Sequence, residues 1–488
     1  MRFLKALCVV ALVFAVSAAA YAETQSVKVS GDITLRGLAR HAYDLDNGRA
    51  ALVNDGTVSS SWATHLMSTA ELQVDADLTD NVSGVVRLVN QRVCGNGDNV
   101  SENAYVTGSV GTPFRHEIET AAVNPGSGAS FDVLVDLAYI ELKEFLYSPL
   151  TLKLGRQDLW FGKGFIVGAN QQNPQNALFA KEYTALNAFD AIRATLDYDP
   201  WTIDAVFAKI NENSREADDD TNLWGVNVGY VFDSYNAEAE AYWWFRQARF
   251  TGETTAGGDT TNLIAVINGH DTNDIHTFGA RGSFDPLEDW TMGLEAAYQC
   301  GEFLGIDSQI NERDRVAYAL DATVECRYWQ DDFAWRPVVG AEYILYSGEK
   351  NVGDLTASTI GDYNGWDFMY RGKFDTAIRE FQNVYYATAM TSCPSNTNQH
   401  QLLFSGTVEP TDSLSLDATY AYFWLDKDYS GNNGANELGS ELDLVVTWDY
   451  TEDLSFNLLA GWFFPGNHFE NSQNDVATDV VGTVKLSF

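Results

Sequence analysis

The chain has 488 residues and a formal net charge of −38 at pH 7, and an acidic balance of this size excludes a nucleic-acid-binding protein. Aromatic residues make up 13% of the chain, which excludes a disordered acidic polypeptide. Together with alternating apolar and polar residues throughout, this content indicates β structure.

The first residues have the organisation of a secretory signal peptide. A short positive region precedes an apolar stretch over 6–20, and Ala-Tyr-Ala at 20–22 supplies the small residues of a cleavage site. The stretch is shorter than the roughly 20 residues that span a bilayer, and no later segment approaches that length, so a helical membrane protein is excluded. The sequence predicts a signal peptide at 1–22 and one mature domain over 23–488.

Beyond the signal peptide, alternating segments are joined by connections that are short and long in turn. A tilted membrane strand needs roughly 9 to 11 residues, and outer-membrane barrels have short periplasmic turns and long external loops. Eight short turns, rich in Pro, Asp, Asn and Ser, fall in chain order at 78–81, 147–149, 198–200, 233–235, 285–288, 330–332, 409–412 and 450–453. They join sixteen strands in pairs, and strands near 26–42 and 476–488 bring the total to eighteen.

The end of the chain favours a membrane barrel over a soluble β-sandwich, which would also alternate. Val484, Leu486 and Phe488 lie on one face of the last strand, and a terminal aromatic after such a strand resembles the assembly signal of outer-membrane proteins. Aromatics such as Tyr198 and Trp201 also crowd the short-turn ends, as in an interfacial girdle. We therefore expect an all-β, transmembrane antiparallel barrel of about 18 strands in the bacterial outer membrane.

The long connections are then extracellular. Two of them, 93–130 and 348–397, are long enough to fold back into the lumen, and within the second Glu380 to Met390 could form an extra hairpin arm. Cys94 and Cys393 both lie in external loops, where an oxidising environment allows them to pair. The acidic run 216–220 could bind Ca²⁺, although such a run is more often a solvated loop. No other cofactor is expected.

Strand alternation assigns charged side chains to the lumen, because a charge on the lipid face costs a few kcal/mol near the midplane. These inward positions include Arg36, Arg40, Arg87, Arg193, Arg281, Arg327, Arg336, Glu441 and Asp443. They could pair with one another across the wall of a water-filled barrel. They could instead form a ladder that binds a charged substrate, and periodicity alone favours the first interpretation.

Three segments of the chain have a recognisable motif pattern. They read LGRQDLWFGKGFIVGAN from Leu154, AFDAIRATLDY from Ala188 and LGSELD from Leu438. These segments resemble the alginate export family of outer-membrane barrels. The resemblance implies passage of an anionic polysaccharide through an arginine-lined constriction. It points first to Arg156 and Arg193, with Asp190, Glu441 and Asp443 beside them. A guanidinium stays charged at any pH, and its fork matches a uronate carboxylate.

The acidic balance departs from that pattern and favours an alternative, a general or substrate-specific porin that prefers cations. A second alternative is a membrane-embedded lipase with a Ser–His pair, for which alternation places His276 on the lipid face, but neither a G-x-S-x-G nor an H-E-x-x-H motif is present. A third is a structural or surface-binding role of the external loops. The expected partners are outer-membrane lipid and lipopolysaccharide, an anionic polysaccharide or small polar solute, and periplasmic export proteins.

Overall fold

A computed structural model describes residues 25–42, 45, 62–94, 133–171, 181–212, 220–250, 271–303, 313–329, 333–350, 361–381, 397–428, 434–469 and 474–488. Nearly all of their regular structure is β. The strands are β1 (Ser26–His41), β2 (Ala63–Thr79), β3 (Val82–Val93), β4 (Leu134–Leu142), β5 (Leu150–Gln157), β6 (Phe189–Tyr198), β7 (Trp201–Asn211), β8 (Thr221–Val231), β9 (Glu238–Phe250), β10 (Asp271–Thr272), β11 (Ile275–Leu287), β12 (Trp290–Phe303), β13 (Arg313–Cys326), β14 (Val338–Tyr346), β15 (Gln399–Thr411), β16 (Leu414–Leu425), β17 (Glu437–Asp449), β18 (Leu454–Pro465) and β19 (Ala477–Ser487).

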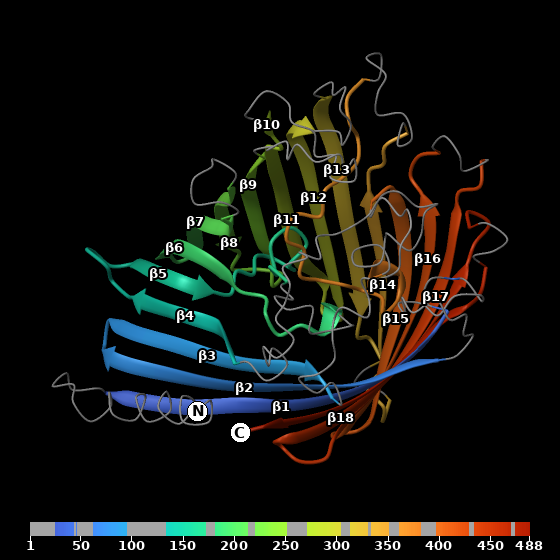
Figure 1. Cartoon of the computed structure of the whole chain (residues 1–488), viewed down its shortest axis with the longest axis horizontal. Coiled ribbons are helices and arrows are strands. Elements are labelled where there is room, and N and C mark those ends of the chain that lie inside the picture. Colours follow the sequence, from blue (N-terminus) through green and yellow to red (C-terminus); the bar gives the residue numbers. More distant parts are fainter. Residues whose placement is uncertain are drawn as a thin grey trace, which may run out of the picture.

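These strands form one closed antiparallel barrel (Figure 1). Each long strand pairs with its neighbours along the chain, and β1 closes the ring by pairing with β19 from Asp32↔Ser487 to His41↔Thr478. β10 is a two-residue strand that extends the pairing of β9, so eighteen long strands make the wall. The predicted strand number is confirmed. Seven of the eight predicted turns connect the expected strands, and the eighth, 330–332, lies outside the described residues, as does the predicted signal peptide.

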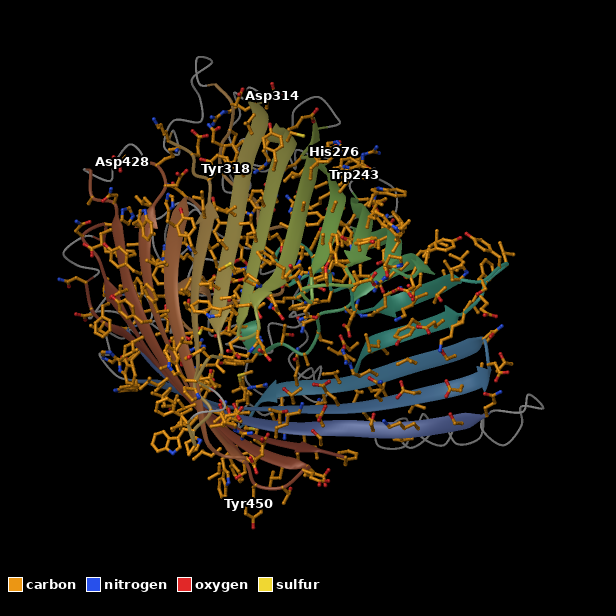
Figure 2. The ribbon with its side chains drawn as sticks, turned by 180° about the vertical axis from the view of Figure 1, so that it is seen from behind. Trp243, His276, Asp314, Tyr318, Asp428 and Tyr450 are labelled. Carbon is orange, nitrogen blue, oxygen red and sulfur yellow. The ribbon has the colours of Figure 1, made fainter. Side chains whose placement is uncertain are left out.

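Alternation along each strand separates an outward from an inward face. On β1, Ile33 and Leu35 are exposed on the outward face, whereas Leu38 and Arg40 are buried inside. Exposed aromatics gather at the short-turn end, where Tyr450 lies opposite the end that carries Asp314 (Figure 2). No helix among the described residues is long and apolar enough to cross a membrane.

Two long connections lie inside the ring of strands. One is the β5–β6 loop, with described residues 158–171 and 181–188, and the other is the segment 361–381 of the β14–β15 loop (Figure 1). The backbone N–H groups of Tyr370 and Gly372 donate to the carbonyls of Ile166 and Gly164 at 2.9 and 2.8 Å. The two loops therefore form one inner unit, which we call the plug.

The plug explains why the lumen is less polar than the sequence predicts. Inward side chains of the wall, including Trp244, Tyr346 and Phe423, pack with Phe165 and Ile166 of the β5–β6 loop into a buried apolar cluster. Burying such side chains stabilises each by roughly 1.5–3 kcal/mol, which favours folding of the loops inward. The expected in-folding of 348–397 is confirmed for its described part. That of 157–187 was not expected, and 95–132 lies outside the described residues.

Other expectations from the sequence can be compared directly. Glu380 lies in a helical turn over 379–381 rather than in a hairpin arm, and the residues from 382 to 396 lie outside the described set. Cys300 pairs with Val316 and Cys326 with Trp290, at opposite ends of β12 and β13, so the two thiols are separate as expected. The predicted Cys94–Cys393 pairing involves a residue outside the described set.

Candidate functional site in the lumen

Two carboxylates of β17 hold the β14–β15 loop. Glu441 accepts the backbone N–H groups of Ile378 and Arg379 at 2.6 and 2.8 Å, and Asp443 accepts that of Ala377 at 3.0 Å. Both carboxylates are buried. Carboxylates commonly accept the free N–H groups that open a helical turn. Glu441 and Asp443 therefore face inward as expected, but they anchor the plug and do not line an open path.

The same loop is held a second time from β9. The guanidinium of Arg246 donates to both carboxylate oxygens of Asp367, at 2.9 and 2.7 Å, and the backbone N–H of Met369 donates to Asp367 at 2.9 Å. Burial alone would raise the pKa of Asp367, but Arg246 and Arg315 outweigh it and lower the pKa to about 2. The contact is an ion pair at every physiological pH.

This ion pair gives a pH-dependent prediction. The Asp367 pKa is about 3.9 when free and about 2 when docked, so the contact stabilises the docked loop above about pH 4 and loses that effect as the pH falls through about 2. We expect Asp367→Asn to conduct more than the wild type in planar bilayers down to about pH 4, and this difference to vanish near pH 2. A difference that already vanishes near pH 6 would contradict the assignment.

The β5–β6 loop crosses the lumen from β5 to the opposite wall. The Nζ of Lys163 donates to Oγ1 of Thr323 on β13 at 2.9 Å. Gly162 packs against Arg281 of β11, since a Cβ at this glycine would lie 2.6 Å from Cδ of the arginine. Arg281 is itself paired with Glu238, at 2.6 Å, and with Glu240. Arg281 therefore faces inward, as predicted, and the loop packs against it.

The second half of that loop docks on the seam of the barrel. Its short 3-10 helix, η3 (Lys181–Tyr183), brings Glu182 into an ion pair with Arg40, which also pairs with Asp479 of β19 at 3.1 Å. The ring of Tyr183 lies 5.0 Å from the guanidinium carbon of Arg36. Arg36 and Arg40 therefore face inward, as predicted, and contact the plug.

Two of the predicted arginines present their charge to the lumen. The side chains of Arg87 and Arg193 are 22% and 25% exposed, whereas those of their partners Asp136 and Asp204 are 0% and 4% exposed. The Nε atoms of these arginines lie 2.7 Å from the buried carboxylates, and Arg193 stands 4.8 Å above the ring of Phe161. The carboxylates of Asp136 and Asp204 are thus buried in the wall and orient the two guanidinium groups, which are partly exposed.

The structure corrects the positions of Arg156 and Asp190. They pair with each other at 3.4 Å across β5 and β6. Leu154 and Ile192 are partners across the two strands and lie on the outward face. Arg156 is two residues from Leu154 and Asp190 is two residues from Ile192, so both share that face, whereas Arg193, next to Ile192, faces inward. The resemblance correctly singled out these strands, but the two residues belong to the outer wall near its extracellular end. The inward member of the first motif is Gln157, fully buried and bonded to the carbonyl of Ala191 at 2.9 Å.

Arg327 and Arg336 also lie elsewhere than predicted. Both follow the end of β13, in the periplasmic connection to β14, and not on the inner face of a strand. Arg327 pairs with Glu325 at 2.6 Å and Arg336 with Glu409 at 2.9 Å. These pairs are partly exposed at the short-turn end, because the two strands are shorter than the alternation suggests.

The described part of the chain contains no cluster of three or more His, Cys, Asp and Glu that could hold a metal ion. Residues 216–219 of the acidic run lie outside it, so calcium binding there stays a prediction. His276 lies on the outward face as expected, beside Trp243 (Figure 2). Its Nδ1 accepts the indole N–H of Trp243 at 3.3 Å, and its ring stacks on Phe245 at 4.3 Å. This histidine belongs to an aromatic stack of the outer wall.

Comparison with known proteins agrees with this architecture. The profile described as Alginate export matches residues 56–483. The chain belongs to the alginate export family. It is an outer-membrane β-barrel channel, of a family of channel-type barrels.

Several solved outer-membrane protein structures have a fold similar to that of this alginate export family protein. OccK8 (OprE) of Pseudomonas aeruginosa aligns with a TM-score of 0.53 and 10% identity over 95% of this chain and 98% of its own. OpdL of the same species aligns with a TM-score of 0.52 and 11% identity over 95% of this chain and 99% of its own. OccAB4 of Acinetobacter baumannii aligns with a TM-score of 0.51 and 10% identity over 94% of this chain and 98% of its own. At these identities the likeness concerns the fold. No curated protein matches the sequence.

Proposed function

We propose that the channel passes an anionic, carboxylate-bearing polysaccharide of the alginate type. The observation that carries the proposal is the arrangement of Arg87 and Arg193, whose cations face the lumen while buried carboxylates lie behind them. A guanidinium oriented in this way can pair with a uronate carboxylate. Asp204 lies at hydrogen-bonding distance from Nε of Arg193, which orients the rest of its fork toward the lumen.

Weak, repeated contacts suit a polymer that must move on. Asp158 approaches Arg87 at 3.5 Å and is half-exposed, so it is a loosely held partner that a substrate carboxylate can replace. Lys153 of β5 is also partly exposed and pairs with Glu141 of β4 at 3.4 Å. Successive uronates would exchange with such acids one at a time, which keeps each binding step shallow.

The principal alternative is a porin that prefers small cations. The net charge of −38 favours it, as does the presence of carboxylates beside every arginine of this group. The two functions differ in the sign of the selectivity. An export channel for uronates prefers anions and is blocked by alginate oligomers, whereas the alternative does neither.

Reversal potentials across a salt gradient test the proposal. We expect wild-type channels to prefer anions, and the double variant Arg87→Gln/Arg193→Gln to move the reversal potential toward cation preference and to weaken block by alginate oligomers. Arg156→Gln is the matched control, since it removes the same charge from the outward face and should leave both quantities unchanged. Cation preference of the wild type without oligomer block would overturn the proposal.

A further inference from the structure

Trp160 is the exposed large side chain on the described part of the β5–β6 loop. The residue is 51% exposed, although its neighbours Leu159 and Phe161 are buried and its ring contacts Gly372 of the other inner loop. Asp158 is exposed as well, so exposed and buried residues alternate along this stretch.

The back of the indole ring rests on the glycines of both inner loops. A Cβ built on Gly164 would lie 2.6 Å from Cζ2 of Trp160, and one built on Gly372 would lie 2.6 Å from Cζ3. A Cβ on Gly168 would meet the backbone of Gly372 at 2.9 Å. A side chain at Gly164 or Gly372 would displace the ring. The indole N–H also donates to the carbonyl of Gly162 at 3.1 Å, which fixes the orientation of the ring.

One face of the ring is held against the glycines, and the exposed face is open to a ligand. Indole is a large, flat and mostly apolar surface on which another ring can stack. The neighbouring charge indicates the class of ligand, because Asp158, two residues before Trp160, lies 3.5 Å from Arg87. The flat apolar platform is thus two residues away from an acid that contacts a guanidinium.

We propose that Trp160 is a stacking platform for a pyranose ring of the transported polysaccharide, with Arg87 placed to take the carboxylate of the same or the next sugar. A pyranose ring has an apolar C–H face and polar edges, which match the indole face and the charged rim. The inference rests on the proposed function for the identity of the polymer. It adds a contact that depends on sugar shape and not on charge.

Block of single channels by two soluble oligosaccharides tests the platform. The probes are an alginate oligomer and an uncharged β-1,4-glucose oligomer of similar length. Trp160→Ala is expected to shorten the residence time of both sugars roughly tenfold, as expected for the loss of one aromatic contact. Trp160→Phe should retain most of the block, and Trp201→Ala, which removes an exposed tryptophan from the outer girdle, should retain all of it.

The two probes separate this inference from the proposed function. Unchanged residence times of both sugars in Trp160→Ala would overturn the platform and leave anion transport standing. If only the uncharged sugar blocks the wild type and Trp160→Ala loses this block, the result would support the platform and overturn the anionic substrate. Absence of any block in the wild type would overturn both. Conductance without sugar is measured in every variant, and an unchanged value shows that the plug is intact.

Discussion

Replacing residues 361–381 by a short Gly-Ser linker is expected to raise the single-channel conductance several-fold. An eighteen-strand barrel without in-folded segments encloses an aqueous channel. In this chain the replaced segment fills part of that space and pairs with the β5–β6 loop through Tyr370 and Gly372. Its removal also takes away the partners of Ile166 and Gly164, so both halves of the plug are loosened. Planar-bilayer recordings measure the effect.

A smaller change, at the two carboxylates of β17 that hold the β14–β15 loop, gives the control. Glu441→Ala with Asp443→Ala leaves the loop sequence intact but removes the three backbone contacts at 377–379. We expect intermediate conductance with frequent transitions between levels, since the Arg246–Asp367 contact still holds the loop. If the linker variant conducts like the wild type, the β14–β15 loop does not restrict the path.

The second large effect is expected at the seam of the barrel. Gly31→Leu should strongly reduce the fraction of protein that forms a closed barrel. Gly31 exchanges two backbone hydrogen bonds of 2.9 Å with Phe488. A Cβ at Gly31 would lie 2.6 Å from the carbonyl oxygen of Glu71 and 2.8 Å from the Phe488 ring, so β1 cannot move away from one neighbour without disturbing the other.

The gel mobility of unheated samples, in which folded barrels resist detergent, measures that fraction. Gly37→Leu is the matched control on the same strand, because nothing lies within 4 Å of a Cβ at Gly37. We expect this variant to fold as the wild type does. Equal folding of the two variants would show that the seam tolerates a side chain and that Phe488 does not depend on the glycine.

The wall of the barrel could be predicted from the sequence because its signal is local. Period-two alternation and tight-turn residues determine which positions face the lipid, and the turns at 78–81 and 450–453 lie where they were expected. Strand ends are less well determined by the same signal. Arg327 and Arg336 were placed on strands for this reason, although β13 stops at Cys326.

The plug could not be predicted in the same way. Nothing in the period of residues 158–171 distinguishes a loop folded inward from one that faces outward, because its contacts with Thr323 and Gly372 are far away in sequence. The family resemblance drew attention to Arg156, which lies on the outer wall, and to Arg193, which faces the lumen. It did not single out the exposed Trp160, which lies between the buried Leu159 and Phe161 and is followed by three glycines within eight residues.

The contact between Arg40, Asp479 and Glu182 has a consequence for the order of assembly. Gly31 and Phe488, which pair at the same seam, are 457 positions apart in the chain, so closure brings together the first and last strands and should be the last and slowest step. Glu182 of the β5–β6 loop joins the first strand at a position where Arg40 also meets the last strand. A loop docked on β1 before closure would present part of the surface that β19 must find, so the plug would act as an internal template for the barrel that contains it.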